Sequence, residues 1–157
     1  MTHNFDIPLP DKELKEKASN VRLATIKTFQ SSNEDRKKAL KLMTKSLLRN
    51  FDEILEANEE DYRRAKNDGI SEALLSRLKL SNEKLFEGIE GVNKVCEIID
   101  PVGQLQVNRE LSKGLILQRK TVPIGVLGVI FESRPDAVIQ ISSLAIRSGN
   151  GVILKGG

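Results

Sequence analysis

The chain has 157 residues, of which 39% are hydrophobic, 30% are charged and 4% are aromatic. This composition is typical of one modest globular unit, and the formal charge of +3 comes from basic residues interleaved with acids, which does not indicate a nucleic-acid surface. No stretch approaches the roughly 18 apolar residues of a membrane helix, and the first residues lack the features of a signal peptide. We therefore expect a cytoplasmic protein with neither a nucleic-acid nor a membrane partner.

Cysteine and histidine, two residue types that often carry chemistry, each occur once. Cys96 cannot form an intrachain disulfide, and His3 lies near the start of the chain. The spacing around Cys96 alternates between four and three residues in a series of apolar side chains: Leu85, Ile89, Val92, Cys96 and Ile99. A cysteine on an apolar helix face is more often a small buried residue than a nucleophile. The sequence therefore predicts no metal site and no His-based triad, and we expect Cys96 to be structural.

The first hundred residues predict a series of helices after an irregular lead-in over residues 1–10. Helices are expected over residues 11–30, from 34 to about 49, over 50–67, from 71 to 78 and from 82 until just before Asp100 and Pro101. A break with an amino cap is expected at residues 31–33, and Ser81 or Asn82 is expected to cap the last helix. The second helix is predicted to bury Leu40, Met43 and Leu47.

Residues 102–122 change to a period of two. Apolar and polar side chains alternate over residues 104–108 and approximately over 115–119, with a polar turn predicted at 109–114. This pattern predicts a two-stranded ribbon. Because a lone ribbon is only marginally stable in water, we expect it to pair with another sheet or with another subunit.

The last stretch of the chain predicts strand, helix and strand in about thirty residues. Residues 125–131 form an apolar run typical of a buried strand, residues 136–147 have helical spacing, and residues 152–154 begin a second strand. Pro135 suits a first helical turn and Gly149 suits a helix end. The predicted helix stripe contains Ala137, Ile141, Leu144 and Ala145, and further apolar residues make the helix apolar almost all round. We therefore expect one right-handed βαβ unit, buried on more than one side, within a larger α/β domain.

Two familiar nucleotide fingerprints are missing from this unit, because the sequence contains neither G-x-G-x-x-G after the first strand nor a P-loop. The turn at residues 132–135 remains as the candidate site, since ligands of open α/β sheets bind at the carboxyl ends of strands. A helix amino terminus favours an anion, Arg134 adds a positive charge, and Lys155 adds a second one at the same edge. The alternative is that Arg134 pairs with Glu132 or Asp136 and that Lys155 is a surface lysine.

Two segments resemble the γ-glutamyl phosphate reductase family, the glutamate-5-semialdehyde dehydrogenase branch of the aldehyde dehydrogenase superfamily. They are VPIGVLGVIFESRPD at residues 122–136 and SGNGVILKGG at residues 148–157. The preceding helices and the ribbon are also similar. The resemblance implies an α/β, aldehyde-dehydrogenase-like fold. Residues 1–101 would be the helical part of the cofactor-binding domain, residues 102–122 a β-ribbon oligomerisation arm, and residues 123–157 the first βαβ unit of a parallel Rossmann-like sheet.

The resemblance implies an NADPH-dependent reductase that converts L-glutamyl 5-phosphate to L-glutamate 5-semialdehyde and phosphate in proline biosynthesis. The ribbon at residues 102–122 suggests a homo-oligomer through strand pairing, and glutamate 5-kinase is a possible upstream partner. Lys155 would contact the adenosine ribose or its 2′-phosphate, and Ser133 and Arg134 would lie near the reacting carbonyl. The full set of cofactor-binding residues implied for NADP(H) is Glu132, Ser133, Arg134, Pro135, Lys155, Gly156 and Gly157.

The resemblance also implies that the family's nucleophilic cysteine and catalytic domain correspond to positions after Gly157. We therefore expect these 157 residues alone to have no reductase activity, as a truncated part of the enzyme. Two alternatives stay open from the sequence, namely a non-catalytic helical interaction module or gene remnant, and an anion-binding regulatory domain that uses the helix terminus at Arg134.

Overall fold

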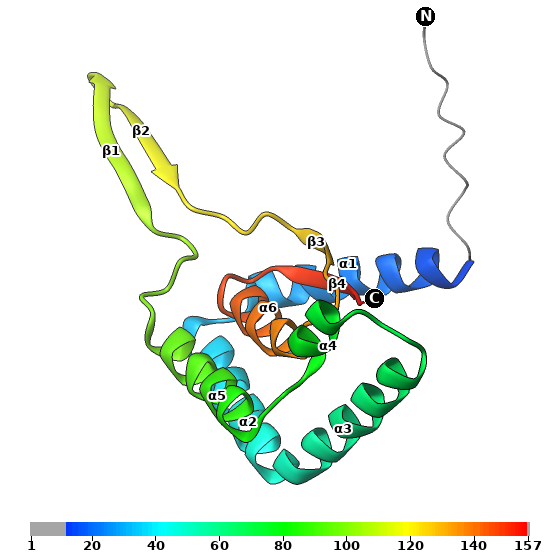
Figure 1. Cartoon of the computed structure of the whole chain (residues 1–157). Helices are drawn as coiled ribbons and strands as arrows, with labels where there is room; N and C mark the ends of the chain where they lie inside the picture. Colours follow the sequence, from blue (N-terminus) through cyan, green and yellow to red (C-terminus); the bar gives the residue numbers. More distant parts are fainter. Residues whose placement is uncertain (1–11, 157) are drawn as a thin grey trace, which may run out of the picture.

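The computed structural model describes residues 12–156, which form six helices and four strands (Figure 1). In chain order these elements are α1 (Lys12–Gln30), α2 (Asn33–Arg49), α3 (Phe51–Asn67), α4 (Glu72–Leu78), α5 (Asn82–Glu97), β1 (Leu105–Ser112), β2 (Leu115–Lys120), β3 (Val126–Ile130), α6 (Pro135–Arg147) and β4 (Gly151–Lys155). The α/β class and the order of helices, ribbon and βαβ unit agree with the sequence prediction. Residues 1–10 of the expected lead-in lie outside the described residues.

Local capping explains why the helices begin where they do. The hydroxyl oxygen of Ser32 accepts a hydrogen bond from the Asp35 N–H at 3.1 Å, and the Asp35 carboxylate accepts one from the Ser32 N–H at 3.2 Å. This reciprocal capping box fixes the start of α2. The Ser81 hydroxyl accepts from the Lys84 N–H at 3.3 Å and caps α5. Both predicted caps are confirmed.

The main core lies between α2, α5 and α6. Its buried members are Leu40, Leu80, Leu85, Ile89, Val92, Cys96 and Ile139, with Met43 and Leu47 packed against them. Each large apolar side chain buried here stabilises the fold by about 1.5–3 kcal/mol. Cys96 is 3% exposed, so its predicted structural role agrees with its position. The prediction for Ile99 is wrong: α5 ends at Glu97, and Ile99 beyond it is 79% exposed.

The ribbon of β1 and β2 projects away from the helices (Figure 1). The two strands pair antiparallel from Leu105 opposite Lys120 to Ser112 opposite Leu115, which leaves a two-residue turn at Lys113 and Gly114. Gly114 has φ +79°, a left-handed conformation that glycine adopts at low cost. The predicted polar turn over residues 109–114 is therefore wrong in its length, because most of those residues belong to β1.

β3 and β4 pair in parallel and α6 connects them, which confirms the predicted βαβ unit. Pro135 occupies the first turn of α6, and Gly149 follows the helix with φ +70°. Helix α1 packs against this small sheet at the start of β4. A Cβ atom added to Gly151 would lie 1.9 Å from the Thr25 hydroxyl oxygen, so only glycine fits this approach.

Two burial predictions for the βαβ unit are wrong. β3 alternates between half-buried and exposed residues instead of being buried, and Ile130 is 84% exposed, because the described elements cover only one of its faces. Ala137 and Ala145 of the predicted α6 stripe are buried, whereas Leu144 is 52% exposed. The remaining buried positions of α6 are Ile139, Ser143 and Arg147. A helix that is apolar almost all round has no single stripe from which the packed face can be chosen.

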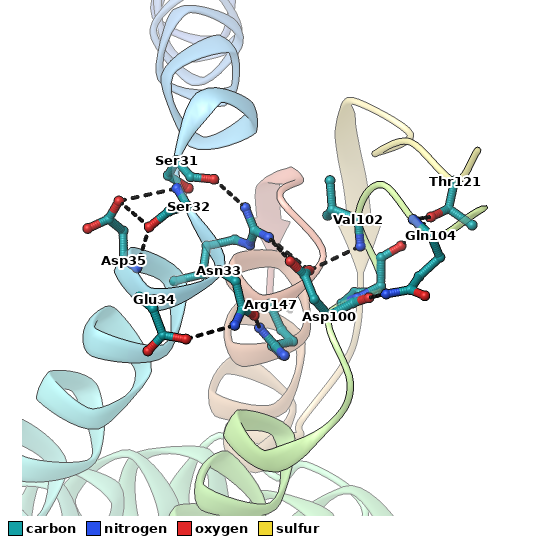
Figure 2. A network of polar contacts seen from close by, with 12 residues as sticks. Ser31, Ser32, Asn33, Glu34, Asp35, Asp100, Val102, Gln104, Thr121 and Arg147 are labelled. Atoms are coloured by element: carbon teal, nitrogen blue, oxygen red, sulfur yellow. Dashed lines mark hydrogen bonds and ion pairs between the residues drawn. The ribbon is translucent and has the colours of Figure 1, made fainter.

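A buried polar network joins α2, α6 and the base of the ribbon (Figure 2). The Arg36 guanidinium, 3% exposed, donates two hydrogen bonds to the Asp100 carboxylate at 2.8 and 2.7 Å. Arg147, 2% exposed, donates to the Asn33 side-chain oxygen at 2.7 Å and to the Ile98 carbonyl. The Nε atoms of both arginines are buried without a partner within residues 12–156. Asp100 is thus the carboxylate that compensates this buried positive charge.

Asp100 also organises the chain that leads into the ribbon. Its carboxylate accepts the Val102 N–H at 3.1 Å, and its carbonyl accepts the Gln104 side-chain amide at 2.8 Å (Figure 2). Partial burial acts to raise the pKa of Asp100, but the Val102 N–H and the Arg36 guanidinium outweigh it and hold that pKa below its usual range. The network therefore depends on an ionised Asp100.

Candidate functional site

The turn between β3 and α6 lies beside the end of β4. The parallel register places Ile130 opposite Lys155, and the Phe131 N–H donates to the Lys155 carbonyl at 3.0 Å. Because the carboxyl ends of parallel strands meet at one edge, residues 132–135 and residues 155–156 share that edge. The structure thus brings together the predicted site residues Glu132, Ser133, Arg134, Pro135, Lys155 and Gly156 at backbone level, while Gly157 lies outside the described residues.

Ser133 has φ +50°, and it is the single non-glycine residue with positive φ within residues 12–156. This conformation costs about 1–3 kcal/mol for a residue with a Cβ atom. Pro135 follows at the start of α6 and has no N–H to donate. The turn therefore holds a strained backbone at a helix amino terminus, a combination that spacing alone did not predict.

Arg134 and Lys155 extend into solvent from this edge. Arg134 is 56% exposed and lies 3.4 Å from the Asp136 carboxylate, which is one of the two pairings that the sequence left open. Such an exposed pair contributes little, about 0–1 kcal/mol, so it leaves the guanidinium able to bind another anion. The Lys155 ammonium donates to the neighbouring Gly156 carbonyl. Among the described residues, Arg134 and Lys155 have no strong ionic partner.

A first cavity of about 460 Å³, here called the turn cavity, lies on one side of Arg134. Phe131, Gly156 and residues 132–135 line it from the sheet edge, and side chains of α3 and α4 line it opposite. It contains the acids Asp61 and Asp68 as well as Arg64, and its charge is therefore mixed. The predicted residues other than Lys155 and Gly157 are among those that line it.

A second, larger cavity of about 910 Å³, here called the helix cavity, lies between α4, α5 and the start of α6. Its charged and polar lining residues are Ser76, Arg77, Lys84, Glu87, Arg134, Asp136 and Gln140. Arg134 lines both cavities and marks their junction. The sequence analysis missed Arg77 and Lys84, because each is one of many basic residues on helices and no motif distinguishes them.

The position of α4, one wall of the helix cavity, depends on Asn58 of α3. The Asn58 side-chain amide donates to the Leu78 carbonyl at 2.9 Å, and its oxygen accepts the Leu80 N–H at 2.8 Å. Asn58 is 8% exposed, so these bonds are shielded from water. Replacing this side chain would leave the Leu78 carbonyl and the Leu80 N–H without these partners, which would destabilise the fold.

Other classes of site receive no support from the described part of the chain. Within residues 12–156, His, Cys, Asp and Glu side chains do not gather in groups of three or more that could hold a metal ion. None of the helices there combines the length and the apolar character needed to cross a bilayer.

Comparison with known proteins shows which proteins this chain resembles in sequence and in fold. No protein-family model matches the chain. A curated γ-glutamyl phosphate reductase from Prochlorococcus marinus subsp. pastoris strain MED4 is 69% identical over all 157 residues. The similarity covers the whole of this chain, and the chain spans 36% of that relative's length.

The fold is also similar to that of solved γ-glutamyl phosphate reductases. The crystal structure of γ-glutamyl phosphate reductase from Thermotoga maritima matches 93% of this chain and 35% of its own length, with a TM-score of 0.88 and 37% identity. A Bacillus subtilis structure assigned as an aldehyde dehydrogenase matches 93% of this chain and 30% of its own, with a TM-score of 0.66 and 20% identity. The aldehyde-dehydrogenase-like α/β fold expected from the sequence is therefore confirmed.

Proposed function

We propose that this chain forms the amino-terminal part of a cytoplasmic, NADPH-dependent reductase of proline biosynthesis. The reaction is the conversion of L-glutamyl 5-phosphate to L-glutamate 5-semialdehyde with release of phosphate. The observation that carries the proposal is the 69% identity to a γ-glutamyl phosphate reductase along the whole chain. The common edge of residues 132–135 and Lys155 at the strand ends supports it, because that edge is where open α/β sheets bind ligands.

The residues at that edge fit a nicotinamide dinucleotide phosphate. Its phosphates are attracted by cations and by the positive end of a helix dipole, and Arg134, Lys155 and the amino terminus of α6 offer these in the described chain. Gly156 lines the turn cavity without a side chain, which leaves room for a close approach. In this proposal Lys155 binds the adenosine ribose or its 2′-phosphate, residues 132–135, Gly156 and Gly157 complete the binding edge, and the bound cofactor supplies the hydride.

The chemistry assigned to this chain is binding and charge stabilisation. In this family the phosphate is displaced by a cysteine thiolate, which we place in the part of the reductase that this chain does not span. Cys96 is buried in the helical core and does not fill that role. In this proposal Arg134, which lines both cavities beside the start of α6, stabilises negative charge that develops on the carbonyl oxygen or the departing phosphate.

We propose two partners beyond the substrate. The ribbon exposes apolar side chains, with Leu111, Leu115 and Ile116 between 52% and 62% exposed, which supports pairing with a second subunit of a homo-oligomer. The acyl phosphate must come from a kinase that acts on glutamate, and glutamate 5-kinase is therefore the proposed upstream partner.

The test is a full-length reductase in which these 157 residues replace the corresponding residues of the Prochlorococcus relative. Activity is followed in reverse, as phosphate-dependent reduction of NADP⁺ by L-glutamate 5-semialdehyde. We expect the hybrid to be active, and Arg134→Gln to lower kcat by about tenfold or more with an unchanged melting temperature. Arg134→Lys keeps the charge and should lose less.

Two results would contradict the proposal. A soluble, folded hybrid without phosphate-dependent activity would show that this chain does not serve the reductase reaction. Equal kcat values for the wild-type and Arg134→Gln hybrids would remove Arg134 from the reaction. As a matched control, Arg49→Gln changes an exposed arginine on α2, away from both cavities, and should leave kcat unchanged.

A further inference from the structure

The helix cavity is not explained by cofactor binding. The turn cavity and Lys155 account for the proposed cofactor edge, whereas the helix cavity extends from Arg134 in another direction, between α4, α5 and α6. Its volume of about 910 Å³ is within the range of roughly 300–1,000 Å³ typical of small-molecule sites.

The charges in this cavity are of both signs and are only partly paired. Asp136 lies 3.4 Å from both Arg134 and the Gln140 amide, so its charge is already partnered. Lys84 donates to the uncharged Lys79 carbonyl at 3.1 Å. Within residues 12–156, the side chains of Arg77 and Glu87 make no hydrogen bond or ion pair, and the Lys84 ammonium makes no ion pair. Two cations and one carboxylate thus remain open to a ligand.

We propose that the helix cavity binds the α-amino-acid end of the substrate, with Arg77 and Lys84 holding the α-carboxylate and Glu87 holding the α-ammonium. This assignment rests on the proposed function, because it takes an acidic amino-acid derivative as the substrate. Arginine and lysine form charge-assisted hydrogen bonds with a carboxylate, and a neighbouring acid does the same for an ammonium group. The group recognised is a zwitterion, which requires both charges side by side.

The presence of Glu87 favours this ligand over a phosphate. A phosphoryl group carries only negative charge, so it could pair with Arg77 and Lys84 but would leave Glu87 without a cationic partner. A zwitterionic end instead gains from one acid among the cations. Arg134 at the junction of the cavities leaves the acyl phosphate near the turn, while the substrate's carbon chain carries the α-carbon away from it toward α4 and α5.

The structure also explains why these residues would act as a unit. Arg77 belongs to α4, Lys84 and Glu87 belong to α5, and the two helices are joined by a three-residue link at residues 79–81. The Leu80 N–H in that link is bonded to the buried Asn58 side chain. The hydrogen bonds of Asn58 hold the backbone of the link, and with it the relative position of the two helices that carry the three side chains.

The test uses the same full-length hybrid and measures three KM values separately in the reverse direction, for L-glutamate 5-semialdehyde, for phosphate and for NADP⁺. Arg77→Gln and Lys84→Met should each raise KM for the semialdehyde by about tenfold, with little change in the other two constants. Arg49→Gln and Lys45→Met, which remove exposed cations from α2, are the matched controls and should change none of the three.

Truncated substrates separate the two ends of the zwitterion. 4-Aminobutanal lacks the carboxylate, and 5-oxopentanoate lacks the ammonium group. The wild-type hybrid should prefer the semialdehyde to both, Arg77→Gln should lose most of its preference over 4-aminobutanal, and Glu87→Gln should lose most of its preference over 5-oxopentanoate. Melting temperatures of all variants should match the wild type, because the three side chains are exposed.

The outcomes distinguish this inference from the proposed function. An inactive wild-type hybrid contradicts the proposed function itself. An active hybrid in which Arg77→Gln and Lys84→Met raise KM for phosphate instead would show that the cavity is a phosphate site and would overturn the inference. Unchanged KM values and unchanged preferences in all three variants would overturn it as well.

Discussion

Replacing Asp100 by asparagine tests whether the buried charge network stabilises the fold. The change keeps the size of the side chain but removes the carboxylate that faces Arg36, which is 3% exposed, at 2.8 and 2.7 Å. Losing one partner of a fully buried pair costs about 3–5 kcal/mol. Because the Asp100 side chain is itself 24% exposed, we expect a smaller loss of about 2–3 kcal/mol in the free energy of unfolding.

The assay is urea unfolding of the chain, followed by circular dichroism at pH 7 and at lower pH values. A loss of this size corresponds to a fall of roughly 5–10 °C in Tm for a chain of this length. The pKa of Asp100 is lower in the folded than in the unfolded state, so its contribution is present above the unfolded pKa of about 4 and disappears as the pH falls through the folded pKa. The difference between wild type and Asp100→Asn should therefore shrink below about pH 4.

The exposed pair between Lys12 and Glu16, at 3.9 Å, provides the control. Glu16→Gln should leave the urea midpoint nearly unchanged, because exposed pairs contribute little. The reasoning is refuted if Asp100→Asn is as stable as the wild type at pH 7, or if the difference between them stays constant from pH 7 to pH 3.

Two further predictions concern backbone positions in the βαβ unit. Gly151→Ala should lower the free energy of unfolding by about 1–3 kcal/mol, because the new Cβ atom would lie 1.9 Å from the Thr25 hydroxyl oxygen. Gly128→Ala on β3 is the control and should be tolerated, because its new Cβ atom would have no atom of the described residues within 4 Å. Equal urea midpoints for the two variants would contradict this account. Ser133→Val should lower the free energy of unfolding by about 1–2 kcal/mol, because β-branched side chains disfavour the positive φ of this residue. Ser133→Gly should be no less stable than the wild type in thermal melts. A Ser133→Val variant as stable as the wild type would show that the turn relaxes.

The helices and the βαβ unit could be predicted because their signals are local. The caps expected within residues 31–33 and at Ser81 or Asn82 are Ser32 and Ser81 in the structure, and Pro135 and Gly149 mark the two ends of α6 as expected. The same local reasoning failed for the ribbon turn, where Gly114 allowed a tighter connection than the polar composition of residues 109–114 suggested.

The buried charge network and the helix cavity could not be predicted from the sequence, because they depend on contacts between elements that are distant in sequence. Arg36 and Asp100 are 64 residues apart, and one sequence does not indicate which of its many charges will be buried. Arg77 and Arg134 become lining residues of one cavity only when α4 and α6 take their places. The edge formed by residues 132–135 and Lys155 was accessible from sequence, since parallel strands impose it.

The Asn58 side chain of α3 hydrogen-bonds the backbone of residues 78 and 80, so natural variation at position 58 would affect a region away from the substituted residue. Asn58 lines the turn cavity but not the helix cavity, so a substitution at this position would leave the lining of the helix cavity intact, yet it would loosen the support of the helix that carries Arg77. Under the proposal that Arg77 binds the substrate, the expected phenotype is weakened selectivity although every residue lining the helix cavity is unchanged. Searches for specificity determinants that inspect only the walls of the helix cavity would overlook Asn58, although its carboxamide fixes the position of α4, which forms one of those walls.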